Sequence, residues 1–131
     1  MRPNPFKPTI FVKSNSVQWL QFPLLNRLPK NVSVFNSSAW ADDASLIARS
    51  TASFCLVIFS PLEKSKEKLD ETIAFSREGG KPVLVLISRD PERGTVMTGR
   101  EFNEISDTLS RENCVIFTEL SKLAMYIRKN I

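Results

Sequence analysis

The sequence predicts an α/β fold built around a parallel sheet of five strands. Five short runs rich in β-branched and aromatic residues recur along the 131-residue chain, each bounded by Ser, Asn, Gly or Pro. Segments with a helical spacing of apolar residues lie between these runs. Strands that alternate with helices are typical of parallel sheets, because a right-handed crossover returns the chain to the same sheet. The predicted strands are residues 9–13, 32–35, 54–59, 82–87 and 114–118.

The third and fourth predicted strands are continuously apolar rather than alternating between apolar and polar residues. Their sequences are FCLVIF (54–59) and PVLVLI (82–87). Strands that are covered by helices on both faces have this composition. We therefore expect these two strands to be central, and we predict a flavodoxin-like, three-layer α/β/α fold with strand order 2-1-3-4-5.

Four of the five predicted helices lie outside the connection between the two central strands. Residues 16–28 are expected to hold the first helix, which Pro23 should shorten or kink, and residues 42–49 the second. Residues 100–111 and 121–130 have apolar side chains at intervals of three and four, which predicts that each helix has one buried face. These side chains are Phe102, Ile105 and Leu109 in the former and Leu123, Ala124 and Ile127 in the latter.

The remaining predicted helix, residues 65–78, connects the two central strands. Ser65 is its expected N-cap, and Gly79 and Gly80 are expected to end it. Leu69 and Ile73 lie four residues apart and are expected to face the core. The lysines at its start are interleaved with carboxylates, which is typical of a solvated face. They are Lys64, Lys66 and Lys68.

Length and composition indicate a single domain, residues 1–131. The chain is 42% hydrophobic and 24% charged, as soluble globular domains are. Its 18 basic residues are mostly interleaved with its 14 acidic ones, so no dedicated nucleic-acid site is expected. We expect no membrane span, and because the start of the chain lacks the apolar core of a secretory signal, the expected location is cytoplasmic.

The absence of some residues and motifs restricts the chemistry. The chain has no histidine, which excludes histidine-based triads and most zinc sites. It has no GxGxxG or Walker motif, so neither a cofactor nor a metal is predicted. Cys55 and Cys114 both lie inside predicted strands, where they are expected to be core residues rather than a disulfide or metal pair.

Ligands of open parallel sheets bind outside the carboxyl ends of the strands. In this sequence those ends are followed mainly by hydroxyl and amide side chains. Such a rim could bind a nucleotide-like ligand or a protein partner, although Ser and Asn also cap strands and helices without any ligand. Residues 89–99 form a long connection and a candidate lid or partner loop. The candidate cleft residues are Ser14, Asn15, Ser38, Trp40, Ser60, Ser88 and Arg89.

Two roles are considered for Trp40 at the carboxyl edge of the predicted sheet. It could stack on a base or anchor a partner, and it could equally cover the end of the core.

Receiver domains of two-component signalling have the same predicted fold and a similar strand spacing. They need an acidic pair after the first strand and an aspartate after the third. Here those places hold Lys13, Ser14 and Ser60. Without carboxylates a hard cation such as magnesium has no ligands, which excludes aspartyl phosphorylation. The chain can therefore resemble only a degenerate receiver that acts without phosphate.

Residues 54–87 resemble the third strand and following helix of TIR domains. The resemblance rests on Ser60-Pro61, on SKEKLDE at 65–71, and on the return strand GKPVLVLI. In TIR domains that cleave NAD, and in related nucleoside deoxyribosyltransferases, a glutamate of this region is the acting residue, and the resemblance assigns that role to Glu71. A carboxylate can orient ribose hydroxyls and stabilise oxocarbenium-like charge. The Trp-Cys pair of the family is replaced by Glu67-Lys68.

Two functions are therefore expected from the sequence. One is a non-catalytic signalling or regulatory domain that binds a protein partner or itself. The other is an enzyme that cleaves a glycosidic bond in NAD or a nucleoside, with Glu71 as the acting carboxylate. Helical phase bears on this choice, because Glu71 lies about 160° around the helix from Leu69 and Ile73, on the side expected to face water. There it would pair with Lys68 or another surface neighbour.

Overall fold

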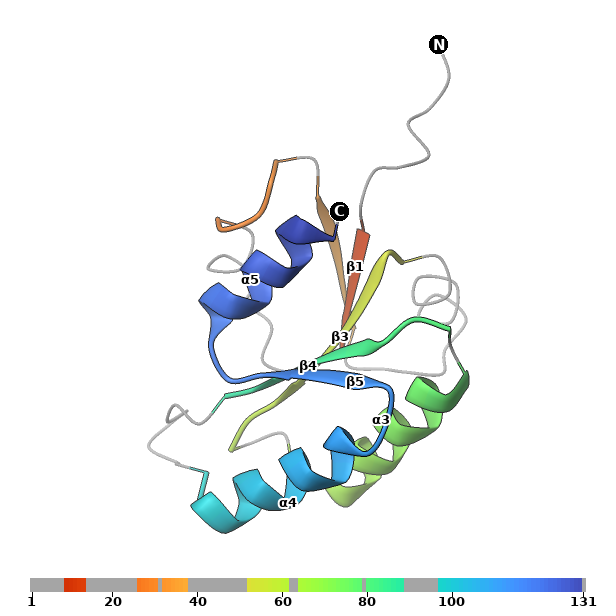
Figure 1. Ribbon diagram of the computed structural model, residues 1–131, viewed down its shortest axis with the longest axis vertical. Helices are drawn as coiled ribbons and strands as arrows, with labels where there is room; N and C mark the ends of the chain where they lie inside the picture. The colour runs from red at the N-terminus through yellow and green to blue at the C-terminus, as the bar shows by residue number, and fades with distance from the viewer. Residues whose placement is uncertain are drawn as a thin grey trace.

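The structure is a computed structural model that describes residues 9–13, 26–30, 32–37, 52–61, 64–78, 80–88 and 97–130. Within these residues, five parallel strands form one sheet with the order β2-β1-β3-β4-β5 (Figure 1). The predicted flavodoxin-like strand order is confirmed. The strands are β1 (Thr9–Lys13), β2 (Ser33–Ser37), β3 (Phe54–Phe59), β4 (Val83–Ile87) and β5 (Cys114–Phe117).

The helices cover both faces of the sheet. Within the described part of the chain they are α3 (Lys66–Glu78), α4 (Gly99–Ser110) and α5 (Leu120–Lys129). Figure 1 shows α3 and α4 together on one face and α5 on the other. The core divides in the same way, since one apolar cluster contains residues of α5 and the other contains residues of α3 and α4.

Alternation along the central strands explains why they are apolar throughout. In β3, Leu56 and Ile58 pack in the cluster with α5, whereas Val57 and Phe59 pack in the cluster with α4. β4 divides its residues in the same way. Because each face is covered, both sets of side chains are buried. The prediction of central strands from continuous apolar runs is confirmed.

The described helices follow the predicted segments closely. The predicted apolar faces of α4 and α5 are confirmed, because Ile105 and Leu109 are buried in α4 and Leu123, Ala124 and Ile127 are buried in α5. Residues 26–28, the end of the first predicted helix, form a turn and a bend instead. The rest of that segment, the predicted helix at 42–49, Gly79 and most of the 89–99 connection lie outside the described residues.

The two cysteines lie on strands that do not neighbour each other. Cys55 is in β3 and Cys114 is in β5, and β4 separates these strands. Two strand spacings amount to about 10 Å, which exceeds the Cα separation that a disulfide spans. The two residues therefore form no disulfide with each other, as predicted.

Helix α4 begins with a reciprocal pair of hydrogen bonds. Thr98 Oγ1 accepts from the Glu101 backbone N–H at 3.1 Å, and Glu101 Oε1 accepts from the Thr98 backbone N–H at 3.1 Å. This capping box satisfies backbone donors that the first turn would otherwise leave without partners.

We expect Thr98→Ala to lower the free energy of unfolding by about 1 kcal/mol, because it removes the hydroxyl that caps α4. Denaturant unfolding followed by circular dichroism measures this change. Thr118→Ala removes an exposed threonine after β5 and is the matched control. Equal midpoints for the two variants would contradict a capping role for Thr98.

Candidate functional site

The strand order reverses between β1 and β3, which makes their carboxyl ends the topological switch point of the sheet. Lys13 is the last residue of β1, and its Cα pairs with that of Val57 in β3. The Lys13 residue is only 9% exposed. An open α/β sheet binds ligands at this place, so the side chains around Lys13 form the first candidate site.

Lys13 forms an ion pair with Glu71 of α3. Lys13 Nζ lies 3.1 Å from Glu71 Oε2, and the two side chains are 11% and 33% exposed. Glu71 Oε2 is itself buried and, within the described part of the chain, accepts no well-aligned hydrogen bond. The contact is therefore mainly an attraction between two charges, and it connects α3 to the end of β1.

The position of Glu71 differs from the position that helical phase predicted. The Glu71 side chain is only partly exposed, and it pairs with Lys13 of another element rather than with Lys68. The reason is that Lys68, Thr72 and Ser76 are the buried residues of α3. Glu71 lies about 100° around the helix axis from this line of buried residues, which is close enough for its side chain to reach β1.

Leu69 and Ile73 lie on the other side of the line formed by the buried residues Lys68, Thr72 and Ser76. Both are half-buried and pack against the cluster that contains Ile105 and Leu109 of α4. Both therefore contact the core, as predicted. The line of fully buried residues, however, lies roughly a quarter of a turn away from them around the helix.

Lys68 is buried, although the sequence predicted a solvated position. Its residue is 8% exposed, and its Nζ donates to the backbone oxygen of Ile58. The same ammonium lies 5.1 Å from the centroid of the Phe59 ring, within the range of a cation–π contact. Lys68 thus fixes α3 to β3 at the level next to Lys13.

The other buried polar groups of α3 are satisfied within the helix. Thr72 Oγ1 donates to the Lys68 carbonyl at 2.8 Å, and Ser76 Oγ donates to the Ile73 carbonyl at 2.8 Å. At the start of the helix, Ser65 Oγ accepts from the Lys68 backbone N–H at 3.1 Å, which confirms Ser65 as the N-cap. The hydroxyl donors of Thr72 and Ser76, on the polar face of α3 that lies against the sheet, therefore both have partners.

Ser60 and Ser88 lie together at the carboxyl ends of β3 and β4. Both are buried, and the Ser88 backbone N–H donates to the Phe59 carbonyl at 2.8 Å. Ser60 lies three residues beyond Val57, about 10 Å further along the strand than the level of Lys13. The sheet register thus brings the two serines together and sets them apart from the Lys13–Glu71 pair.

The other residues of the predicted cleft lie outside the described residues and stay predictions. They are Ser14, Asn15, Ser38, Trp40 and Arg89.

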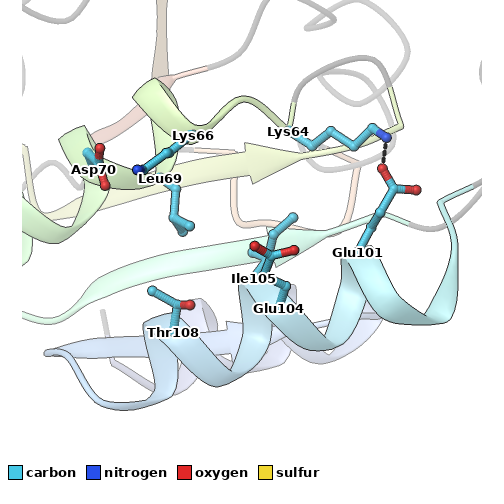
Figure 2. Close-up of a pocket in the computed structure, with 8 residues that line it drawn as sticks. All are labelled: Lys64, Lys66, Leu69, Asp70, Glu101, Glu104, Ile105 and Thr108. Atoms are coloured by element: carbon cyan, nitrogen blue, oxygen red, sulfur yellow. Dashed lines mark ion pairs between the residues drawn. The ribbon is translucent and has the colours of Figure 1, made fainter.

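A second concave feature lies between α3 and α4 (Figure 2). This α3–α4 groove has a volume of about 350 Å³. It is lined by Lys64, Lys66, Leu69 and Asp70 at and just before the start of α3, and by Glu101, Glu104, Ile105 and Thr108 of α4. Figure 2 shows Leu69 pointing from α3 and Ile105 pointing from α4 toward the space between the helices. Lys64 and Glu101 form an ion pair at one end, and Asp70 and Glu104 add negative charge along the rims.

Sequence reasoning missed two features of these sites. The partner of Lys13 was not foreseen, although a lone charge at the end of an otherwise apolar strand, TIFVK, requires one when it is buried. The α3–α4 groove was also not foreseen, because it depends on how two helices pack. The spacing of Lys68, Thr72 and Ser76 at intervals of four was the available signal for the orientation of α3.

Two described groups with shifted pKa values, Arg77 and Cys114, lie at the opposite, amino-terminal edge of the sheet. The pKa of Arg77 is raised by its hydrogen bonds to Glu112 and by attraction to that carboxylate, whose Oε1 is 3.1 Å from Arg77 Nε. Burial raises the pKa of the Cys114 thiol, the Glu112 charge raises it further, and a hydrogen bond with Ser76 opposes the rise. These contacts join the end of α3 to the start of β5 and take no part in the switch point.

Among the residues that the structure describes, no three His, Cys, Asp or Glu side chains form a group that could hold a metal ion. None of the described helices is long and apolar enough to cross a membrane. Comparison of the chain with models of protein families, with curated proteins and with solved structures finds no match.

We expect Glu71→Gln to lower the free energy of unfolding by about 1–3 kcal/mol, between the values for exposed and for fully buried ion pairs. The variant removes the Glu71 charge from beside the nearly buried Lys13 ammonium. Adding Lys13→Met should recover much of the loss, because the methionine places no charge there. Denaturant unfolding of the wild type, both single variants and the double variant gives the coupling.

Glu67→Gln is the control for this cycle, because Glu67 is an exposed carboxylate in the same helix. Its effect should stay within a few tenths of a kcal/mol. Strictly additive effects of Glu71→Gln and Lys13→Met would show that the ion pair does not stabilise the fold.

Proposed function

We propose that this chain is a non-catalytic protein-interaction domain that acts in signalling or regulation. The observation that carries the proposal is the Lys13–Glu71 ion pair at the switch point. Glu71 is the residue to which the resemblance with TIR domains assigns catalysis. Its charge is engaged by an ammonium of its own chain, and the pair connects α3 to β1.

The chemistry of glycosidic cleavage supports this proposal. A carboxylate stabilises oxocarbenium-like charge when its own negative charge faces the sugar and is not offset. Here an ammonium lies 3.1 Å from one carboxylate oxygen, and that oxygen is buried. A substrate would have to separate this pair, which removes a close attraction from the Lys13 ammonium, whose side chain is 11% exposed.

The described surface is also suited to protein contacts of modest size. The α3–α4 groove combines apolar side chains with charged rims, as protein interfaces do. Within the described residues, Met125 is the one large hydrophobic side chain that is well exposed, at 48%. A reversible contact with polar edges therefore fits this surface better than an extensive apolar interface.

The second candidate function is cleavage of NAD or a nucleoside with Glu71 as the acting carboxylate. One observation favours it: Glu71 lies beside the end of β1 at the switch point, not on the solvent side of α3. Nicotinamide or free-base release separates the two functions directly.

We expect no release of nicotinamide from NAD, or of free base from deoxynucleosides, above the buffer rate. Liquid chromatography of long incubations at high protein concentration measures both products. Wild type, Glu71→Gln and the exposed-carboxylate control Glu67→Gln are compared. Release that is retained in Glu67→Gln and lost in Glu71→Gln would replace the binding function with the enzymatic one.

A further inference from the structure

The solvent side of α5 combines an exposed apolar residue with basic residues. Met125 is 48% exposed, and Lys122 and Lys129 lie three residues before it and four residues after it on the same helix face. We refer to Lys122, Met125 and Lys129 as the α5 outer stripe. Lys122 makes only an exposed contact with Glu119 at 3.5 Å, and Lys129 forms no ion pair with a described residue.

The α3–α4 groove has the complementary composition. Leu69 and Ile105 contribute its apolar part, and Asp70 and Glu104 are exposed on its two rims. Neither Asp70 nor Glu104 is ion-paired within the described ranges. Lys64 is neutralised by Glu101, which leaves Lys66 as the single unpaired cation of the lining and gives the rims a net negative charge.

These two surfaces cannot meet within one molecule. α5 packs on one face of the sheet, whereas α3 and α4 pack on the other (Figure 1). Any contact between the α5 outer stripe and the α3–α4 groove therefore joins two copies of the chain. Since the stripe spans about 10 Å along the helix, its two ammonium groups can lie on either side of an inserted Met125.

We infer that the α3–α4 groove binds the α5 outer stripe of a second copy of this chain. Met125 packs against Leu69 and Ile105, and the flanking lysines lie beside Asp70 and Glu104. This inference rests on the proposed binding function and specifies its partner. The groove and the stripe lie on opposite faces of the sheet, so the contact is heterologous and repeats from copy to copy, as an open chain or a closed ring, rather than forming a symmetric dimer.

Charge reversal with exchange tests the inference. Sedimentation velocity across a concentration series, at low and at physiological salt, measures self-association of the wild type. We expect association that weakens with salt, because exposed charges are screened. Asp70→Lys/Glu104→Lys and, separately, Lys122→Glu/Lys129→Glu should each raise the dissociation constant at least about tenfold, because each places like charges in contact.

An equimolar mixture of the two charge-reversed proteins should associate again, since a basic groove then meets an acidic stripe. Glu67→Lys/Asp107→Lys is the matched control for the groove variant: it makes the same change in net charge as Asp70→Lys/Glu104→Lys, at exposed positions of α3 and α4 that do not line the groove. This control should associate like the wild type. Circular dichroism confirms that each variant is folded.

A wild-type chain that stays monomeric at every concentration would overturn the inference, and so would reversed variants that associate as well as the control. A mixture that remains monomeric would also overturn it. These outcomes can be distinguished from a failure of the proposed function. If the chain is monomeric and releases no nicotinamide, a second copy is not the partner, but the proposed binding function stands. If Glu71-dependent release is observed, the binding function itself is wrong.

Discussion

Lys13 carries a charge at the end of a buried strand, and the arrangement of the site follows from how that charge is neutralised. A charge that is removed from water without a partner is strongly unfavourable. Glu71 supplies the counter-charge from α3 at 3.1 Å, which fixes that helix against the switch point. The same contact occupies the carboxylate that a TIR-like reaction would need. One ion pair thus connects a helix to the edge of the sheet and engages the carboxylate on which the proposed function and its enzymatic alternative differ.

The orientation of α3 has a second consequence on the side away from β1. With Lys68, Thr72 and Ser76 toward the sheet, Leu69 turns toward α4 and forms part of the groove. Lys68 reinforces this orientation through the Ile58 carbonyl and the Phe59 ring. A polar buried face contributes less hydrophobic free energy than an apolar one, but it favours one angular position of the helix because each polar group needs its partner.

The strands, the strand order, the three described helices and the buried faces of two of them could be predicted from the sequence because their signals are local. Continuous apolar runs identify β3 and β4, and apolar spacing identifies the buried faces of α4 and α5. The buried face of α3 was not predicted, because apolar periodicity selects Leu69 and Ile73 whereas polar contacts decide the packing. The Lys13–Glu71 pair and the groove depend on that packing, so neither could be read from local pattern.

The central claim is that Glu71 holds α3 against β1 rather than performing chemistry. Site-resolved amide hydrogen exchange of the wild type and of Glu71→Gln tests it most directly, since it reports the local stability of each element. The account predicts that protection of the α3 amides falls well below that of the α4 amides in the variant. Unchanged protection in α3, or an equal loss in both helices, would contradict it.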